Sequence, residues 1–386
     1  MARWITIGAL VGVTACSPQA AAPADAGPPP EAALIVTGAD RSVSLLGPAG
    51  ATTIIADSLP GGVSIQPTPA PGGDAVIFTG SGKDDEVVAV VWAAGTVTEI
   101  DFGFAPFYYQ WSPNGERVVA LGNGSSGVAA AIASRDGSEL VRLGSDTPYF
   151  LSWSPDGGRI ATHRGGEGLA VVDLDGSASP LGARPGAFQA PEWINDHQLI
   201  VVAEGSSLEA STTPATKDLA RLVIADIDGT TTELAPLGAA GHFSYDPVSD
   251  RLAVIDGDSA SERLRIIDMA TGDARELATE PVLAMEWSPD GTRLLTFVVR
   301  DRQLVPQVWV DATMEAEYPP FEPSQTFLTE YLQFWGQYMR SVQLWAPSSD
   351  EFVYATVEDE IVSQSLGSEP QVVSEGVMAQ WTSPPA

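Results

Sequence analysis

Short apolar runs separated by compact groups of Pro, Asn, Asp and Gly extend along most of this chain. The clearest unit has apolar runs at residues 107–111, 117–121, 128–134 and 139–143. Runs of this length between turn residues predict short antiparallel strands, and Asp136-Gly137 before the last run is a strong hairpin signal. The same four-strand plan fits residues 149–181, 188–234 and 243–277.

The turn after the first strand of each unit recurs almost unchanged. It reads Trp-Ser-Pro-Asn-Gly at 111–115 and Trp-Ser-Pro-Asp-Gly at 153–157 and 287–291. Weaker copies occur at residues 193–196, 245–247 and 345–347. Pro, Asn or Asp, and Gly suit successive positions of a tight turn. A strand repeat with a period of about 40 residues is typical of a β-propeller.

The inner strand of each blade should precede this turn, so inner strands count the blades. Candidates lie at residues 63–66, 107–111, 150–153, 189–193, 242–245, 283–287, 342–345 and 377–381. The last has no strands after it, and the first unit, at 34–56, lacks an inner strand. We therefore expect an all-β fold over residues 33–386, a single propeller of eight four-stranded blades whose C-terminal strand completes the N-terminal blade. Seven blades is the alternative, because the units near 193–245 and 287–345 are irregular.

One insertion, at residues 311–340, is rich in aromatic residues. Ser324 could cap a helix over residues 325–339, with an apolar face recurring at every fourth residue. One interpretation packs this helix on the propeller's own surface. The other exposes an aromatic partner surface made of Phe327, Tyr331, Phe334, Trp335 and Tyr338.

The N-terminal segment reads as an export signal at residues 1–15, with Arg3 before an apolar stretch too short to span a bilayer. It ends in Val13-Thr14-Ala15-Cys16, which resembles the lipobox of bacterial lipoproteins. That resemblance implies lipidation, palmitate included, at Cys16, and Ser17 after it favours the outer membrane. An ordinary cleaved signal is the alternative. Residues 16–32, rich in Pro and Ala, would form an extended tether.

Charge and motifs narrow the function. The chain has 50 acidic and 19 basic residues and a formal charge of −31, which argues against nucleic acid and against docking on anionic lipid. The three histidines lack zinc-site spacing, and the Asp-x-Asp-Gly segments at 173–176 and 226–229 lack the span of an EF-hand. No Gly-x-Ser-x-Gly elbow occurs. We therefore predict no catalytic residue, metal or cofactor.

The Trp-Ser-Pro-Asp-Gly repeat resembles that of the TolB-like propeller family, over most of the chain after the tether. The resemblance implies the fold and says little of function. The repeat tryptophans should act as wedges between blades; they are Trp111, Trp153, Trp193, Trp287, Trp345 and Trp381.

These observations predict a non-enzymatic, lipid-anchored propeller that binds envelope proteins in the periplasm or at the cell surface. One alternative is a hydrolase or lactonase with its site at the central channel. Another is carbohydrate binding through Phe107, Tyr108, Tyr109 and the aromatics of residues 318–338. An enzyme requires titratable groups that converge at one end of the channel, whereas a scaffold requires an exposed apolar or aromatic patch.

Overall fold

The computed structural model describes residues 32–47, 50–56, 66–81, 86–125, 127–146, 149–165, 168–186, 189–204, 220–237, 241–256, 263–277, 280–336 and 341–382. The predicted signal, Cys16, nearly all of the tether, and Tyr338 lie outside these residues. None of the described helices is long and apolar enough to cross a membrane.

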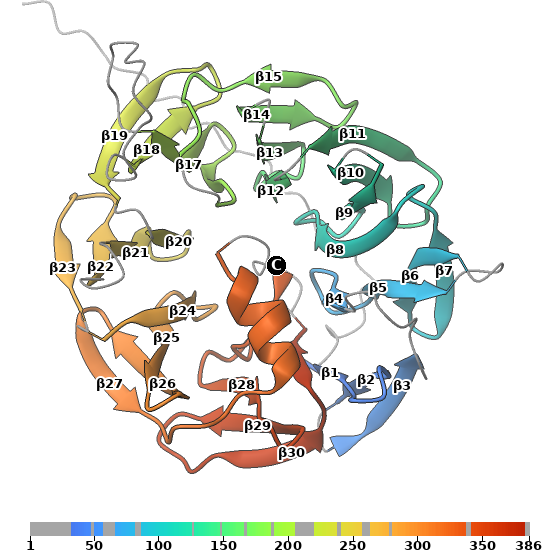
Figure 1. Cartoon of the computed structure of the whole chain (residues 1–386), viewed down its shortest axis with the longest axis vertical. Helices are drawn as coiled ribbons and strands as arrows, with labels where there is room; N and C mark the ends of the chain where they lie inside the picture. The colour runs from blue at the N-terminus through green and yellow to red at the C-terminus, as the bar shows by residue number, and fades with distance from the viewer. Residues whose placement is uncertain are drawn as a thin grey trace, which may run out of the picture.

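Eight antiparallel blades form a ring, with inner strands near the axis and outer strands at the rim (Figure 1). Blade 1 contains β31 (Met378–Trp381), β1 (Leu34–Thr37), β2 (Val43–Leu46) and β3 (Thr52–Ala56). Blade 2 contains β4 (Thr68–Pro69), β5 (Val76–Ser81), β6 (Val87–Ala93) and β7 (Thr96–Ile100). Blade 3 contains β8 (Ala105–Trp111), β9 (Arg117–Gly124), β10 (Gly127–Ser134) and β11 (Leu140–Asp146). Blade 4 contains β12 (Tyr149–Trp153), β13 (Arg159–Arg164), β14 (Gly168–Asp173) and β15 (Ala178–Pro180).

The second half of the ring follows the same plan. Blade 5 contains β16 (Glu192–Asn195), β17 (Gln198–Glu204), β18 (Ala220–Asp226) and β19 (Thr231–Pro236). Blade 6 contains β20 (His242–Asp246), β21 (Arg251–Asp256), β22 (Arg263–Asp268) and β23 (Ala274–Glu276). Blade 7 contains β24 (Val282–Trp287), β25 (Arg293–Arg300), β26 (Gln303–Val310) and β27 (Thr313–Glu317). Blade 8 contains β28 (Glu351–Ala355), β29 (Glu360–Ser365) and β30 (Gln371–Glu375).

The two ends of the propeller meet in blade 1. β31 pairs antiparallel with β1, in a register that places Trp381 opposite Leu34 and Met378 opposite Thr37. Beyond the pair, the Thr382 N–H donates to the carbonyl of Ala33 at 2.9 Å. The prediction of eight blades closed by the C-terminal strand is therefore confirmed.

Two inner strands are shorter than expected. In blade 8 the inner position is held by a bridge between Trp345 and Phe352, and the Val353 N–H donates to the carbonyl of Leu344 at 3.0 Å. In blade 2 the inner strand is Thr68–Pro69. Most of the predicted strand at 63–66 lies outside the described residues.

The recurring turn is held by its own side chains. In the copy at 153–157, the Ser154 hydroxyl donates to Asp156 at 2.6 Å and accepts the Arg159 N–H at 3.0 Å. The Gly157 N–H donates to the Ser154 carbonyl at 2.9 Å, and Gly157 has a φ of +67°, which favours glycine. These local bonds explain why the turn motif recurs, since each copy starts the second strand at the same point.

The helical insertion differs from the predicted helix. Residues 325–326 form a short α-turn, η3 (Phe327–Tyr331) is a π-helix, and η4 (Leu332–Phe334) is a 3₁₀ helix. Ser324 does cap it, because its hydroxyl accepts the Phe327 N–H at 3.0 Å. The wide turn of the π-helix, followed by the tight turn of the 3₁₀ helix, replaces the regular α-helical period that the sequence suggested. In Figure 1 this segment lies inside the ring, within the circle of inner strands.

The core consists mainly of clusters between neighbouring blades. Separate clusters join blades 1 and 2, 2 and 3, 3 and 4, 4 and 5, and 5 and 6. A single larger cluster joins blades 6, 7, 8 and 1 with the helical insertion. The insertion is therefore part of the core on one side of the ring.

Candidate functional site at the central channel

The repeat tryptophans connect each blade to the one before it. In five of the six, the indole N–H donates to a main-chain carbonyl of the preceding inner strand. The pairs are Trp111 to Thr68 at 3.1 Å, Trp153 to Gln110 at 3.0 Å, Trp193 to Ser152 at 3.1 Å, Trp287 to Ser244 at 3.0 Å and Trp345 to Glu286 at 3.2 Å. Trp381 lies in β31, where its main-chain N–H donates to the carbonyl of Gln343 at 2.8 Å.

The joint between blades 5 and 6 is made differently. Tyr245 occupies the position of the tryptophan, and its hydroxyl donates to Asp250 in its own blade at 2.9 Å. The Tyr245 main-chain N–H donates instead to the carboxylate of Glu192, on β16 of blade 5, at 2.7 Å. A buried glutamate therefore makes the contact that an indole makes elsewhere.

Beside this joint lies a cavity of about 520 Å³, here called the channel cavity. It is bounded by the inner strands of blades 5, 6 and 7, by the turns that follow β20 and β24, and by the helical insertion. Its lining includes Glu192, Tyr245, Val248, Glu286, Tyr331 and Trp335. Cavities of this size and mixed lining are typical of small-molecule sites.

Glu286, on β24, connects three elements. Its Oε1 accepts the Leu344 N–H from blade 8 at 2.9 Å, and its Oε2 accepts the Tyr331 hydroxyl from the insertion at 3.2 Å. Burial raises the pKa of the Glu286 carboxyl to about 7, and these hydrogen bonds oppose the rise. A group that titrates near neutral pH thus faces the cavity.

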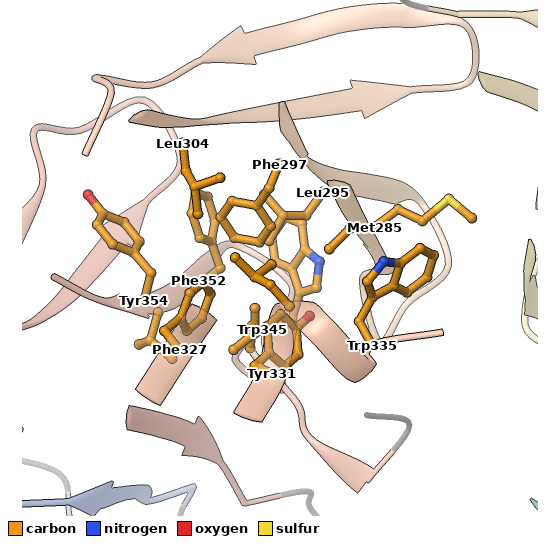
Figure 2. Close-up of a cluster of buried hydrophobic side chains, with 14 of the residues drawn as sticks. Met285, Leu295, Phe297, Leu304, Phe327, Tyr331, Trp335, Trp345, Phe352 and Tyr354 are labelled. Atoms are coloured by element: carbon orange, nitrogen blue, oxygen red, sulfur yellow. The ribbon is translucent and has the colours of Figure 1, made fainter. Parts of the chain in front are cut away.

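The aromatic residues of the insertion point inward. Phe327 and Tyr331 are buried, with ring centroids 5.0 Å apart, and Phe327 also meets Phe297 at 5.8 Å. Figure 2 shows Phe327 and Tyr331 among the aromatic side chains around Trp345 and Phe352, with Trp335 beside Met285.

The predicted aromatic partner surface is therefore wrong for Phe327, Tyr331 and Trp335, because burying these rings stabilises the fold more than exposing them. Phe334 is half-buried against the same cluster, and Tyr338 lies outside the described residues. Two of the five predicted residues, Tyr331 and Trp335, line the channel cavity instead.

The aromatic residues proposed for sugar stacking in blade 3 are also internal. Tyr108 and Tyr109 are buried, and the Tyr109 hydroxyl is hydrogen-bonded to that of Thr79 at 2.9 Å. Phe107 is half-buried against the cluster between blades 3 and 4. Their rings are therefore engaged in packing.

The histidines do not form a site together. His163 is buried beside the carbonyl of Gln189 at 3.3 Å, His197 lies in a turn, and His242 contacts the Trp335 ring with centroids 5.4 Å apart. Burial lowers the pKa of His163 and of His242. Within the described residues, no group of three His, Cys, Asp or Glu side chains could hold a metal ion.

The carboxylates of the Asp-x-Asp-Gly segments at 173–176 and 226–229 stabilise the turns in which they lie. The Asp175 carboxylate accepts the Ser177 N–H at 2.8 Å, and that of Asp228 accepts the Thr230 N–H at 2.9 Å. The Ser177 hydroxyl, which donates to Asp175 at 2.6 Å, together with the Ser177 N–H lowers the pKa of Asp175, and the Thr230 N–H lowers that of Asp228.

Sequence reasoning missed Glu192 and Glu286. A signal was present, since each glutamate immediately precedes the aromatic residue of its repeat, where Gln110, Ser152 and Ser244 stand in other blades. The aligned repeats place this polar position next to the channel. A single glutamate in a strand does not stand out until the repeats are superposed.

No protein-family model and no curated protein matches the sequence. Similar solved structures include TolB and other β-propellers. A eukaryotic initiation factor matches over 92% of this chain and 99% of its own, with a TM-score of 0.52 and 11% identity. The propeller domain of the Trilobed protease from Pyrococcus furiosus matches over 81% and 98%, with a TM-score of 0.49 and 12% identity. TolB from Acinetobacter baumannii matches over 72% of this chain and 60% of its own, with a TM-score of 0.39 and 12% identity. The likeness shows the fold alone.

Proposed function

We propose that this chain is a non-enzymatic binding propeller that takes its ligand in the channel cavity. The observation that carries the proposal is the cavity of about 520 Å³, lined by carboxylate and aromatic side chains from three blades and the insertion. A concave site with a few polar groups among aromatic side chains suits recognition of a small molecule or of a group on a larger partner. The rigid ring would hold these side chains in place.

The cellular location of the protein is part of the same proposal. Lipidation of Cys16 would anchor the propeller to a bacterial envelope membrane, with the outer membrane favoured, and residues 17–32 would separate the two. The Trp-Ser-Pro-Asp-Gly repeat supports membership of the TolB-like family. An envelope protein remains the proposed partner, and the burial of Tyr331 and Trp335 moves its expected contact from an outer aromatic patch to the mouth of the cavity.

Catalysis at the channel is a second candidate that one observation favours. Glu286 titrates at about pH 7 beside the cavity, as a general acid or base would. Both of its carboxylate oxygens already accept hydrogen bonds from the chain itself, which favours a binding or structural role.

Val248 offers a way to test the cavity without disturbing the core. It lines the mouth and is 64% exposed, so Val248→Trp should narrow the entrance and leave the fold intact. Val372→Trp is the matched control, since Val372 is 57% exposed on the outer strand of blade 8.

The measurement is native mass spectrometry of the full-length chain purified from envelopes in mild detergent. We expect a bound species in the wild type and in the control, and its loss in Val248→Trp. Equal retention by all three proteins would show that the cavity is not the site. Conversion of the released species by wild-type protein would favour the catalytic candidate.

A further inference from the structure

We infer that the channel cavity binds an organic ammonium ion between the carboxylates of Glu192 and Glu286. This inference rests on the proposal that the cavity is a ligand site, and it adds the chemical class of the ligand. It follows from the charge of the lining, from the free acceptor capacity of Glu286, and from the aromatic walls.

The charged side chains that line the cavity are all acidic. They are Glu192, Asp246 and Glu286, and no Arg, Lys or His occurs in the lining among the described residues. Asp246 is committed to its own turn, where it accepts the N–H groups of Val248 at 3.2 Å and Ser249 at 2.9 Å. Glu192 and Glu286 come from blades 5 and 7, on either side of blade 6, and each also accepts hydrogen bonds from the chain. An anion would be repelled from this cavity and a cation attracted.

Glu286 keeps acceptor capacity after its internal contacts. Each of its oxygens accepts one hydrogen bond from the chain, from Leu344 or from Tyr331. An ionised carboxylate offers about four acceptor positions. The remaining positions can take N–H donors from a primary ammonium group without breaking either contact. A quaternary ammonium group has no N–H and is attracted to the carboxylate by the charge alone.

Aromatic residues line the same cavity as the carboxylates. Tyr245, Trp287, Tyr331 and Trp335 all line the cavity, and the faces of such rings attract cations. Trp287 already does so within the protein, since the Arg251 guanidinium lies 5.0 Å from its ring centroid. His242, beside Trp335, does not oppose a cation, because burial lowers its pKa and keeps the imidazole neutral at neutral pH.

Two other ligand classes fit less well. A metal ion needs several ligands converging within about 2.6 Å of one point, and no group of three candidate ligands exists among the described residues. A neutral sugar could bond to the oxygens and stack on the rings, but it would leave the negative charge of the cavity lining uncompensated. An organic cation uses both the rings and the charge.

Proton linkage gives a distinctive signature. Burial keeps the Glu286 carboxyl partly protonated near neutral pH, while Tyr331 donates to it and Glu192 and Asp246 line the same cavity. A bound cation favours the ionised form, so binding should release a proton. Affinity should therefore increase as the pH rises through about 7 and level off above it.

The test is calorimetric titration of the full-length chain with choline and with cadaverine. The matched neutral probes are 3,3-dimethylbutan-1-ol and pentane-1,5-diol, which have similar shapes without charge. We expect the ammonium probes to bind at least about tenfold more tightly than their neutral partners. We also expect tighter binding at about pH 8 than at about pH 5.5, with proton release detected by comparing buffers of different ionisation enthalpy.

Three variants locate the effect. Glu286→Gln should weaken ammonium binding by at least about tenfold and remove its pH dependence, and Glu192→Gln should weaken it to a similar degree. Glu375→Gln makes the same change of charge at an exposed residue outside the cavity and should bind as wild type does. Circular dichroism of each variant checks that it is folded.

The outcomes separate this inference from the proposed function. If neither ammonium probe binds at about 10 mM, or if Val248→Trp leaves ammonium binding unchanged, the inference is overturned. If neutral and charged probes bind equally and Val248→Trp blocks both, the ligand class is wrong while the cavity remains a binding site.

Discussion

Blades 2 to 5 and blades 6 to 8 are built from one repeat but packed in two ways. Indole hydrogen bonds connect inner strands in both regions. In the first region each pair of neighbouring blades shares its own cluster. In the second region one continuous cluster joins three blades, blade 1 and the insertion, and glutamates take part in the joints. The channel cavity lies where the second arrangement begins. It lies beside the joint in which a glutamate makes the contact that an indole makes elsewhere.

The largest predicted effect tests whether the insertion belongs to the core. Phe327 is fully buried against Phe297 and Tyr331, so Phe327→Ala should lower the free energy of unfolding by about 3–5 kcal/mol. Leu328→Ala is the control in the same helical segment, where the side chain is 38% exposed, and it should change stability by less than about 1 kcal/mol. Chemical denaturation measures both. Similar small effects for the two variants would show that the insertion is not part of the core.

The second largest predicted effect is the dependence of protein stability on pH that Glu286 causes. The folded-state pKa is raised to about 7 from an ordinary value of 4.5, so the fold favours the protonated carboxyl. The stabilisation that comes from the protonated Glu286 carboxyl is complete below the unfolded pKa and is lost as the pH rises through about 7. Over the full range the free energy of unfolding changes by about 3 kcal/mol.

Glu286→Gln keeps an acceptor oxygen and carries no charge, so its stability should vary less between about pH 5 and pH 8 than that of the wild type. Glu375→Gln should keep the wild-type profile. Denaturation at a series of pH values measures the difference. Parallel profiles for wild type and Glu286→Gln would contradict the raised pKa.

The sequence predicted the regular region better than the irregular one. Trp153 and its turn carry local information, because Ser154, Asp156 and Gly157 form the turn among themselves. The number of blades and the closure follow from counting such turns.

The insertion and the cavity depend on contacts that are distant in sequence. The spacing of Phe327 and Tyr331 indicated one apolar face, but whether that face met solvent or blade 7 depended on the shape of the closed ring. Glu192 and Glu286 lie far apart in the chain and reach one cavity only after three blades have assembled.

A smaller effect should follow from weakening one regular joint. Trp153→Phe removes the indole donor to Gln110 and leaves a smaller ring at a buried position, so it should lower the free energy of unfolding by about 2 kcal/mol. Thermal unfolding measured by calorimetry provides the value. An unchanged midpoint would show that the indole bonds do not stabilise the ring.

The smallest effect should come from Tyr245, which occupies the same repeat position in the irregular region. Its hydroxyl bonds to Asp250 within blade 6 and not to blade 5, so Tyr245→Phe should lower stability by about 1 kcal/mol or less, less than Trp153→Phe. Glu192→Ala is the informative control, because it removes the acceptor of the Tyr245 N–H, the contact that does cross between the blades. We expect this control to lower stability more than Tyr245→Phe does. If the tyrosine variant proved as damaging as Trp153→Phe and more damaging than Glu192→Ala, the bond within blade 6 would stabilise the fold more than the contact between the blades, and Glu192 would be left with ligand binding as its main role.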